Sequence, residues 1–284
     1  MVWIASLHSQ SDNKMKNLFL IALLILAFAA SAQQVEPVRY EVGRWSKEQG
    51  CHFQSFGEKG GVMLYETDKT DREKHRLWCF SCVDSSLYET RSDMIPLPDK
   101  LAFIDSGSDD RFAAFLFVNE GNRKASDSLD FLVVCYNRTE DVYQTFWNKW
   151  PEKSVPLSVA VADGTMLVAL NNKNGNGILC FYDLTSHACR TVTPSCSSSF
   201  VLFQTQAFAK EHCFVVAAKE FEDKHFVSTS FLVYSTTGGL QSASRYENIA
   251  NAALGRTFSR TLAILTTLAP SSSLISLTPD VIRL

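Results

Sequence analysis

The chain has 284 residues, a formal charge of −3, and 46% hydrophobic and 12% aromatic residues. This composition excludes a largely disordered chain, and the balanced charge, without an acidic or basic block, argues against nucleic acid or an anionic membrane surface as a partner. The first predicted element is an apolar run, Leu18–Phe28, which follows a short basic start at Met15 and Lys16 and precedes Ala30-Ser31-Ala32.

This run has the pattern of a secretory signal peptide, and it is shorter than the roughly 20 residues that a membrane-spanning helix needs. We therefore expect residues 1–32 to be an N-terminal extension with a signal peptide, and residues 33–284 to be one exported domain. It would be secreted or extracellular, or periplasmic in a bacterium, without stable membrane insertion after cleavage. Either Met15 is the true start, or residues 1–14 extend the signal peptide.

Beyond Gln33 the chain shows short runs of β-branched and aromatic residues, separated by Gly, Asn, Asp, Ser and Pro, which is the signature of β-strands. The clearest series predicts strands at 157–161, 165–170, 178–182 and 189–192, with a tight hairpin turn at Asp163-Gly164. Looser copies occur on both sides. The aromatic residue of the third strand recurs at Phe80, Tyr136, Phe181 and Tyr234, at intervals of 45 to 56 residues. A strand-rich repeat of this period is typical of a propeller.

The segment Ile178-Leu-Cys-Phe-Tyr-Asp-Leu-Thr185 resembles the third strand and following turn of a β-propeller blade. The resemblance implies an all-β, β-propeller-like domain of about five or six four-stranded blades, with 274–277 or 281–282 supplying a closing strand. The residues from Thr257 to Leu268 read as a strand pair or a short helix. A β-sandwich or two stacked β-domains remain the alternative. The Trp-Asp and Gly-His pairs of WD40 repeats and the double glycine of kelch repeats are missing, so no specific family is indicated.

Eight cysteines follow the signal peptide, and in an exported protein an even number indicates disulfides. Pro194 lies between Cys189 and Cys196 and favours a local bridge; otherwise Cys196 pairs elsewhere. Cys79 and Cys82 have the Cys-x-x-Cys spacing, but strand-like flanks would point their sulfurs to opposite faces. They are expected to be structural rather than redox or zinc cysteines.

The sequon Asn137-Arg138-Thr139 predicts glycosylation of Asn137 if the protein comes from a eukaryote. Acidic residues gather nearby, and their main expected role is in turns, although carboxylates could also act on a glycosidic bond or bind calcium. These residues are Asp105, Asp109, Asp110, Asp127 and Asp130.

Ligand contact is predicted at Trp147, Lys149 and Trp150, because exposed indoles stack on sugar rings or anchor protein partners. The alternative is that both tryptophans pack between blades. We expect no catalytic residues, metal site or cofactor. The predicted function is a secreted, non-enzymatic binding protein for an unknown extracellular protein or glycan. The alternative is a secreted glycan-directed hydrolase with carboxylates at the mouth of the propeller channel.

Overall fold

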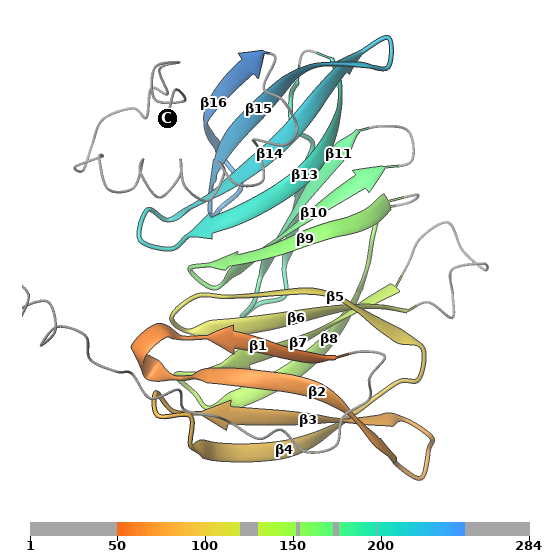
Figure 1. The fold of residues 1–284 in the computed structure, drawn as a ribbon, viewed down its shortest axis with the longest axis vertical. Helices are drawn as coiled ribbons and strands as arrows, with labels where there is room; N and C mark the ends of the chain where they lie inside the picture. The colour runs from red at the N-terminus through yellow and green to blue at the C-terminus, as the bar shows by residue number, and fades with distance from the viewer. Residues whose placement is uncertain (1–49, 120–129, 152–153, 173–175, 197, 248–284) are drawn as a thin grey trace, which may run out of the picture. The chain divides into compact units, whose positions relative to one another are not determined.

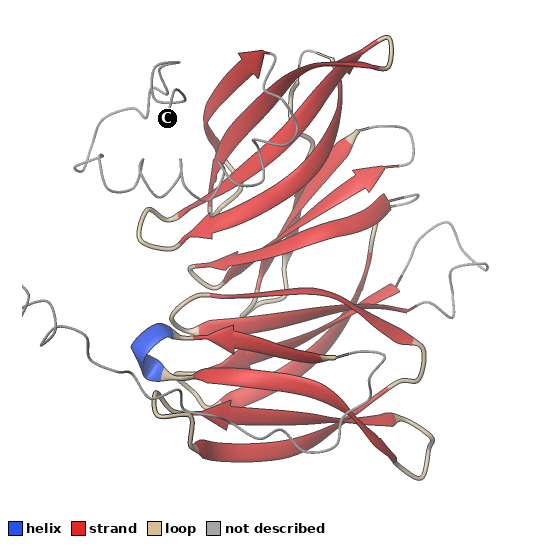
Figure 2. Ribbon diagram, in the orientation of Figure 1, coloured by secondary structure: helices blue, strands red, loops and turns tan. Residues whose placement is uncertain are grey.

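The computed structural model describes residues 50–119, 130–151, 154–172, 176–196 and 198–247. These residues belong to one compact unit, Val42–Leu284, and form sixteen β-strands and one short 3-10 helix, η1 (Gly57–Lys59) (Figures 1 and 2). Within them, no helix has the length and apolar character needed to cross a bilayer.

Each set of four consecutive strands forms one antiparallel sheet with its strands in chain order. Sheet 1 consists of β1 (Cys51–Ser55), β2 (Gly61–Thr70), β3 (Arg76–Val83) and β4 (Glu89–Leu97). Sheet 2 consists of β5 (Leu101–Ser108), β6 (Phe112–Asn119), β7 (Asp130–Asn137) and β8 (Val142–Lys149).

The second half of the described chain repeats this plan (Figure 1). Sheet 3 consists of β9 (Ser154–Ala162), β10 (Thr165–Asn172), β11 (Gly177–Asp183) and β12 (Cys189–Val192). Sheet 4 consists of β13 (Ser199–Phe208), β14 (Cys213–Glu222), β15 (His225–Ser235) and β16 (Leu240–Glu247). All four strands predicted for the clearest repeat are confirmed.

The apolar runs in the middle strands arise because both faces of these strands are buried. In β6, Leu116 contributes to the core cluster shared by sheets 2 and 3, whereas Phe115 and Phe117 contribute to the cluster shared by sheets 1 and 2. Alternate side chains point to opposite faces of a strand, so a strand buried on both faces needs a continuous apolar run. This explains why the simple alternation of polar and apolar residues is missing there.

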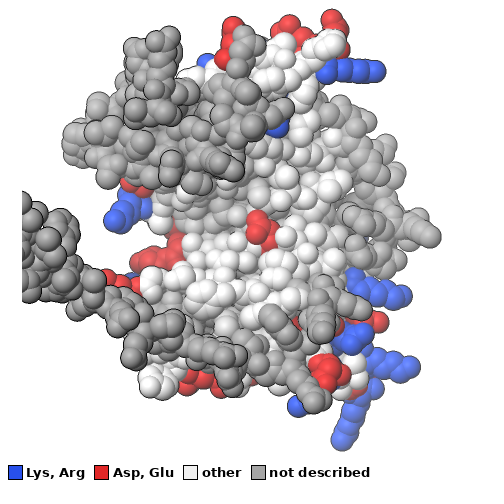
Figure 3. All heavy atoms as spheres, viewed as in Figure 1, with Lys and Arg blue, Asp and Glu red and all other residues white. Residues whose placement is uncertain are grey.

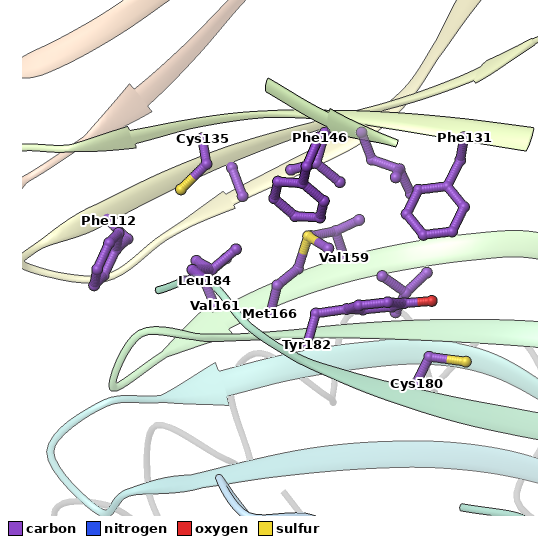
Figure 4. Packing of buried hydrophobic residues seen from close by; sticks show 14 of the residues in the cluster. Phe112, Phe131, Cys135, Phe146, Val159, Val161, Met166, Cys180, Tyr182 and Leu184 are labelled. Atoms are coloured by element: carbon purple, nitrogen blue, oxygen red, sulfur yellow. The ribbon is translucent and has the colours of Figure 1, made fainter. Parts of the chain in front are cut away.

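Three hydrophobic clusters join successive sheets, namely sheets 1 and 2, sheets 2 and 3, and sheets 3 and 4. Figure 4 shows the middle cluster, in which Phe131 and Phe146 of sheet 2 lie against Met166 and Tyr182 of sheet 3. A fourth, smaller cluster around Val215 lies on the other face of sheet 4. The sheets therefore pack in series, each against the next.

The turn at Asp163-Gly164 is the two-residue hairpin that the sequence predicts. Both residues have positive φ, 51° for Asp163 and 70° for Gly164, and they join β9 directly to β10. Asp and Gly adopt this left-handed region more readily than other residues, and such turns match the twist of the strands.

The architecture confirms an all-β fold of blade-like, four-stranded antiparallel sheets, rather than two facing sheets. The described residues contain four such sheets. The segments expected to supply further strands (257–268, 274–277 and 281–282) lie outside the described residues, as does the signal peptide. The number of five or six blades stays a prediction.

Candidate ligand-binding surface

A row of four side chains on β8 forms the candidate ligand-binding surface. Tyr143, Thr145, Trp147 and Lys149 alternate with residues of the opposite face, so they lie on one face of this outermost strand of sheet 2. We call them the β8 row. Trp147 is 48% exposed and the side chain of Lys149 is 74% exposed. At about 3.4 Å per residue, the row extends over roughly 20 Å.

The contacts of Tyr143 show which way the β8 row points. Its ring packs against the cluster shared by sheets 1 and 2, with its centroid 5.4 Å from that of Phe80. Phe146 points the other way, into the cluster shared by sheets 2 and 3, where it stacks on His187. The β8 row thus lies on the side of sheet 2 that faces sheet 1. Tyr143 packs against the cluster between these sheets, whereas Trp147 is exposed.

A polar cluster holds Arg91 of β4 beside this row. The Arg91 guanidinium lies 5.7 Å from the ring centroid of Tyr143 and donates a 2.6 Å hydrogen bond to Asp93. It also pairs with the Asp141 carboxylate at 3.2 Å, and that carboxylate accepts a 2.8 Å hydrogen bond from the Tyr136 hydroxyl. The Tyr136 hydroxyl and then Arg91 lower the pKa of Asp141. The contacts with Asp93 and Asp141 together hold the guanidinium in place.

The structure separates the two tryptophans that the sequence groups together. Trp150 is only 2% exposed and its ring stacks on Phe131 with centroids 3.8 Å apart, inside the cluster shared by sheets 2 and 3. Its indole N–H finds no hydrogen-bond partner among the described residues. Trp150 therefore lies where the alternative interpretation placed it, while Trp147 and Lys149 are accessible. Lys149 is 3.8 Å from Asp130, and because the lysine side chain is largely exposed, this pair adds little stability.

A second surface is formed by the first strands of the four sheets, which contact one another in chain order. Polar side chains link them, with 2.6 Å between Gln54 and Ser106 and 2.9 Å between Ser158 and Thr205. On the face shown in Figure 3, most described atoms over β5 and β9 belong to uncharged residues. Exposed apolar side chains also occur on these strands, at Phe53, Val155 and Val201.

Asp105 is the single carboxylate on the four described first strands. It accepts hydrogen bonds from the backbone N–H groups of Val159, at 2.8 Å, and Ser106, at 2.9 Å. Burial raises its pKa, against the effect of these two amides. A hydrolase of glycosidic bonds needs two carboxyl groups roughly 5–10 Å apart. The described first strands do not provide such a pair.

Most of the other acidic residues named from the sequence have structural contacts. The buried Asp109 carboxylate accepts hydrogen bonds from three backbone amides, those of Arg111, Phe112 and Gly164. Asp110 lies 3.8 Å from Lys59 at the surface. Asp127 lies outside the described residues. No group of three or more potential metal ligands is found among the described residues.

Asn137 ends β7 and is only 7% exposed. Its side-chain oxygen accepts hydrogen bonds from the backbone amides of Thr139, at 3.1 Å, and Glu140, at 3.4 Å. The side-chain oxygen thus closes the turn between β7 and β8, and these bonds leave the amide nitrogen, the atom that would carry a glycan, unused. Glycosylation of Asn137 stays a prediction.

All eight cysteines lie in described residues, and each is a free thiol. Cys79 and Cys82 are buried within β3, three residues apart and so on opposite faces, as their strand-like flanks predicted. Their structural role stays a prediction. Cys189 and Cys196 are not bonded to each other. Cys196 packs against the cluster shared by sheets 3 and 4, and the thiol next to Cys189 is that of Cys180.

Sequence reasoning missed Tyr143, Thr145 and Arg91. The alternation of residues along β8 is a signal that could have added Tyr143 and Thr145 to Trp147 and Lys149. No sequence pattern points to Arg91, because its position beside Tyr143 depends on how sheet 1 packs against sheet 2.

No protein-family model matches this chain, and no curated protein matches its sequence. Several solved structures have a similar arrangement over part of their length. Prolyl oligopeptidase B from Galerina marginata is 14% identical, with a TM-score of 0.44 over 76% of this chain and 30% of its own. The Synechocystis apocarotenoid oxygenase is 9% identical, with a TM-score of 0.43 over 74% of this chain and 51% of its own. Acylaminoacyl peptidase from Pyrococcus horikoshii is 12% identical, with a TM-score of 0.35 over 53% of this chain and 26% of its own. The chain thus spans between about a quarter and a half of these proteins, and at these scores the likeness assigns no activity.

Proposed function

We propose that this protein is an exported, non-enzymatic binding protein that holds a protein or glycan ligand on its blade-like sheets. The observation that carries this proposal is the β8 row. It presents one half-exposed indole, one phenol ring and one lysine on a single strand face, beside an arginine fixed by two carboxylates.

The side chains of the β8 row are suited to binding a ligand. Aromatic rings bury a large area at low entropic cost when they stack on a sugar ring or enter a pocket of a protein. Lys149 and Arg91 add hydrogen-bond donors, three on an ammonium and five on a guanidinium. Both cations are partly neutralised by Asp130 and by Asp93 and Asp141, so the surface carries no large positive field. This favours a ligand recognised by stacking and hydrogen bonds over a polyanion.

The hydrolase alternative has no comparable support. The described first strands carry only Asp105, and both of its oxygens accept a backbone amide. A carboxylate held in this way supports the junction between sheets 2 and 3.

Binding is tested with the purified full chain on a glycan array and a panel of extracellular proteins. Trp147→Ala should weaken binding to any ligand found by about 30-fold or more, as expected for a central aromatic contact. Val142→Ala is the matched control, because Val142 is an exposed apolar residue on the opposite face of the same strand. Equal binding by the wild type and by Trp147→Ala, with both variants folded, would contradict the role of the β8 row.

Export is tested separately by producing the full chain in a secretory host. The mature protein should appear outside the cytoplasm and begin at Gln33. Retention in the cytoplasm with residues 1–32 still attached would refute export, whatever the binding experiments show.

A further inference from the structure

Two cysteines of sheet 3 are diagonal neighbours on the same sheet face. In the pairing of β11 with β12, Tyr182 lies opposite Cys189 and Cys180 lies opposite Thr191. Residues directly opposite each other share a face, and so do residues two apart along a strand. Cys180 and Cys189 are therefore diagonal neighbours across the two strands, and each thiol shifts the pKa of the other.

The two thiols differ in access to solvent. Cys180 is only 1% exposed and belongs to the cluster shared by sheets 2 and 3 (Figure 4). Cys189 begins β12, a four-residue strand at the edge of sheet 3, and is the one exposed cysteine of the eight. A reagent from solvent can thus reach Cys189, whereas Cys180 can be reached only through its neighbour.

The surroundings of Cys189 favour its thiolate. The hydrogen bond from Cys180 is the main cause that lowers the pKa of Cys189, and the Tyr182 hydroxyl and Thr191 act in the same direction against partial burial. The same contact, with burial, raises the pKa of Cys180. Since the thiolate is the nucleophile in thiol–disulfide exchange, the pair has an exposed attacking thiol and a buried resolving thiol.

We propose that Cys189 and Cys180 form a redox-active pair that small disulfides convert into a cross-strand disulfide between β11 and β12. In the first step the Cys189 thiolate attacks one sulfur of the small disulfide. A mixed disulfide forms, the sulfur–sulfur bond of the reagent breaks, and one reagent thiolate leaves. In the second step Cys180 loses its proton, its sulfur attacks that of Cys189, and a second reagent thiolate leaves and takes up a proton. Two protein thiols are oxidised and one reagent disulfide is reduced to two thiols.

The geometry also explains why this pair is favoured over others. Diagonal Cα atoms lie roughly 7–8 Å apart in a regular sheet, and a disulfide needs less than about 7 Å. A small shift of the short edge strand β12 therefore closes the bond. Cys51 and Cys79 lie on opposite sides of Tyr65 and so are two strand spacings apart, roughly 9–10 Å, which is too far.

The experiment treats the reduced, desalted full-length protein with oxidised glutathione at pH 7, blocks the remaining thiols and maps the peptides by mass spectrometry. Trypsin leaves Cys180 and Cys189 together in the peptide 174–190, because no Lys or Arg separates them, and Cys196 falls in the next peptide. The expected product is the peptide 174–190, two hydrogens lighter and unreactive to the blocking reagent. Cleavage after Tyr182 should then leave two fragments joined by the disulfide.

Variants separate the two steps. Cys180→Ser should accumulate a stable glutathione adduct on Cys189, Cys189→Ser should show neither adduct nor disulfide in this peptide, and Cys196→Ser should behave as the wild type. In the reduced wild type, Cys189 should be alkylated at pH 6.5 at least about ten times faster than any other cysteine. A lasting adduct on wild-type Cys189, a link between Cys189 and Cys196, or no reaction at Cys189 would each overturn the proposal. The wild-type peptide map decides the question even if the Cys180 variant does not fold.

Discussion

Replacing Asp109 tests how successive sheets are joined. Asp109 is the first residue of the turn between β5 and β6. One of its carboxylate oxygens accepts hydrogen bonds from the backbone amides of Arg111, at 2.8 Å, and Phe112, at 2.6 Å. The other oxygen accepts the amide of Gly164 at 2.8 Å, in the turn of the next sheet. One side chain thus stabilises its own turn and ties sheet 2 to sheet 3.

The magnitude follows from what each substitution leaves unpaired. Asp109→Ala removes three charge-assisted hydrogen bonds and leaves the buried Phe112 amide and the Gly164 amide without an acceptor, at about 1–3 kcal/mol each. We expect a loss of about 3–5 kcal/mol in the free energy of unfolding. Asp109→Asn keeps one carbonyl oxygen for the turn but turns an amide donor toward Gly164, so a loss of about 1–3 kcal/mol is expected.

Urea unfolding of the purified chain, followed by circular dichroism, measures these losses. Asp110→Ala is the matched control, because the neighbouring Asp110 side chain is 80% exposed and pairs only weakly with Lys59 at 3.8 Å. It should change the free energy of unfolding by no more than about 0.5 kcal/mol. If Asp109→Ala is as stable as Asp110→Ala, the contact between the two turns does not support the junction of the sheets.

Three further predictions concern single residues. Gly60→Ala should cost about 3 kcal/mol or more, because an added Cβ would lie 2.0 Å from the Val83 oxygen at a φ of 89°. Gly57→Ala is the control, because Gly57 also has a positive φ, 64°, but an added Cβ there would meet no atom within 4 Å. It should lower the free energy of unfolding by about 1 kcal/mol. If thermal unfolding gives equal losses for the two variants, the steric argument is wrong. Trp150→Ala should cost about 3–5 kcal/mol in urea unfolding, and a loss below about 1 kcal/mol would show that its stacking is not part of the core. The pKa of Asp141 is lowered in the folded protein, so its contribution is present above about pH 4 and lost as the pH falls through the folded-state value. Asp141→Asn should therefore give a flatter stability profile between about pH 4 and pH 2, and an unchanged slope would argue against this contribution.

Much of the fold could be predicted from the sequence because local patterns determine the strands. The segments predicted at 157–161, 165–170, 178–182 and 189–192 coincide with β9 to β12, and the turn at Asp163-Gly164 has the expected backbone. Here β-branched residues, an Asp-Gly turn and a recurring aromatic residue all agree, and such agreement between local signals specifies a supersecondary unit.

The site was harder to predict, because exposure and pairing depend on packing between elements. Trp147 and Trp150 look alike in the sequence, yet Phe131 covers one of them and not the other. Likewise, the spacing of Cys189 and Cys196 suggested a bridge, but the register of β12 against β11 places Cys180 next to Cys189. A shift of one residue in that register would have moved the Cys189 side chain to the opposite face.

The serial arrangement of the sheets has a consequence for how such a chain can change in length. Each described sheet is made of one continuous stretch of sequence, and among the described residues the three clusters between sheets each join sheets that follow one another. A duplication or deletion of one whole stretch would therefore replace one interface with a similar one, instead of breaking strands that are far apart in the chain. Evolution can thus add or remove units here without redesigning the rest of the interior.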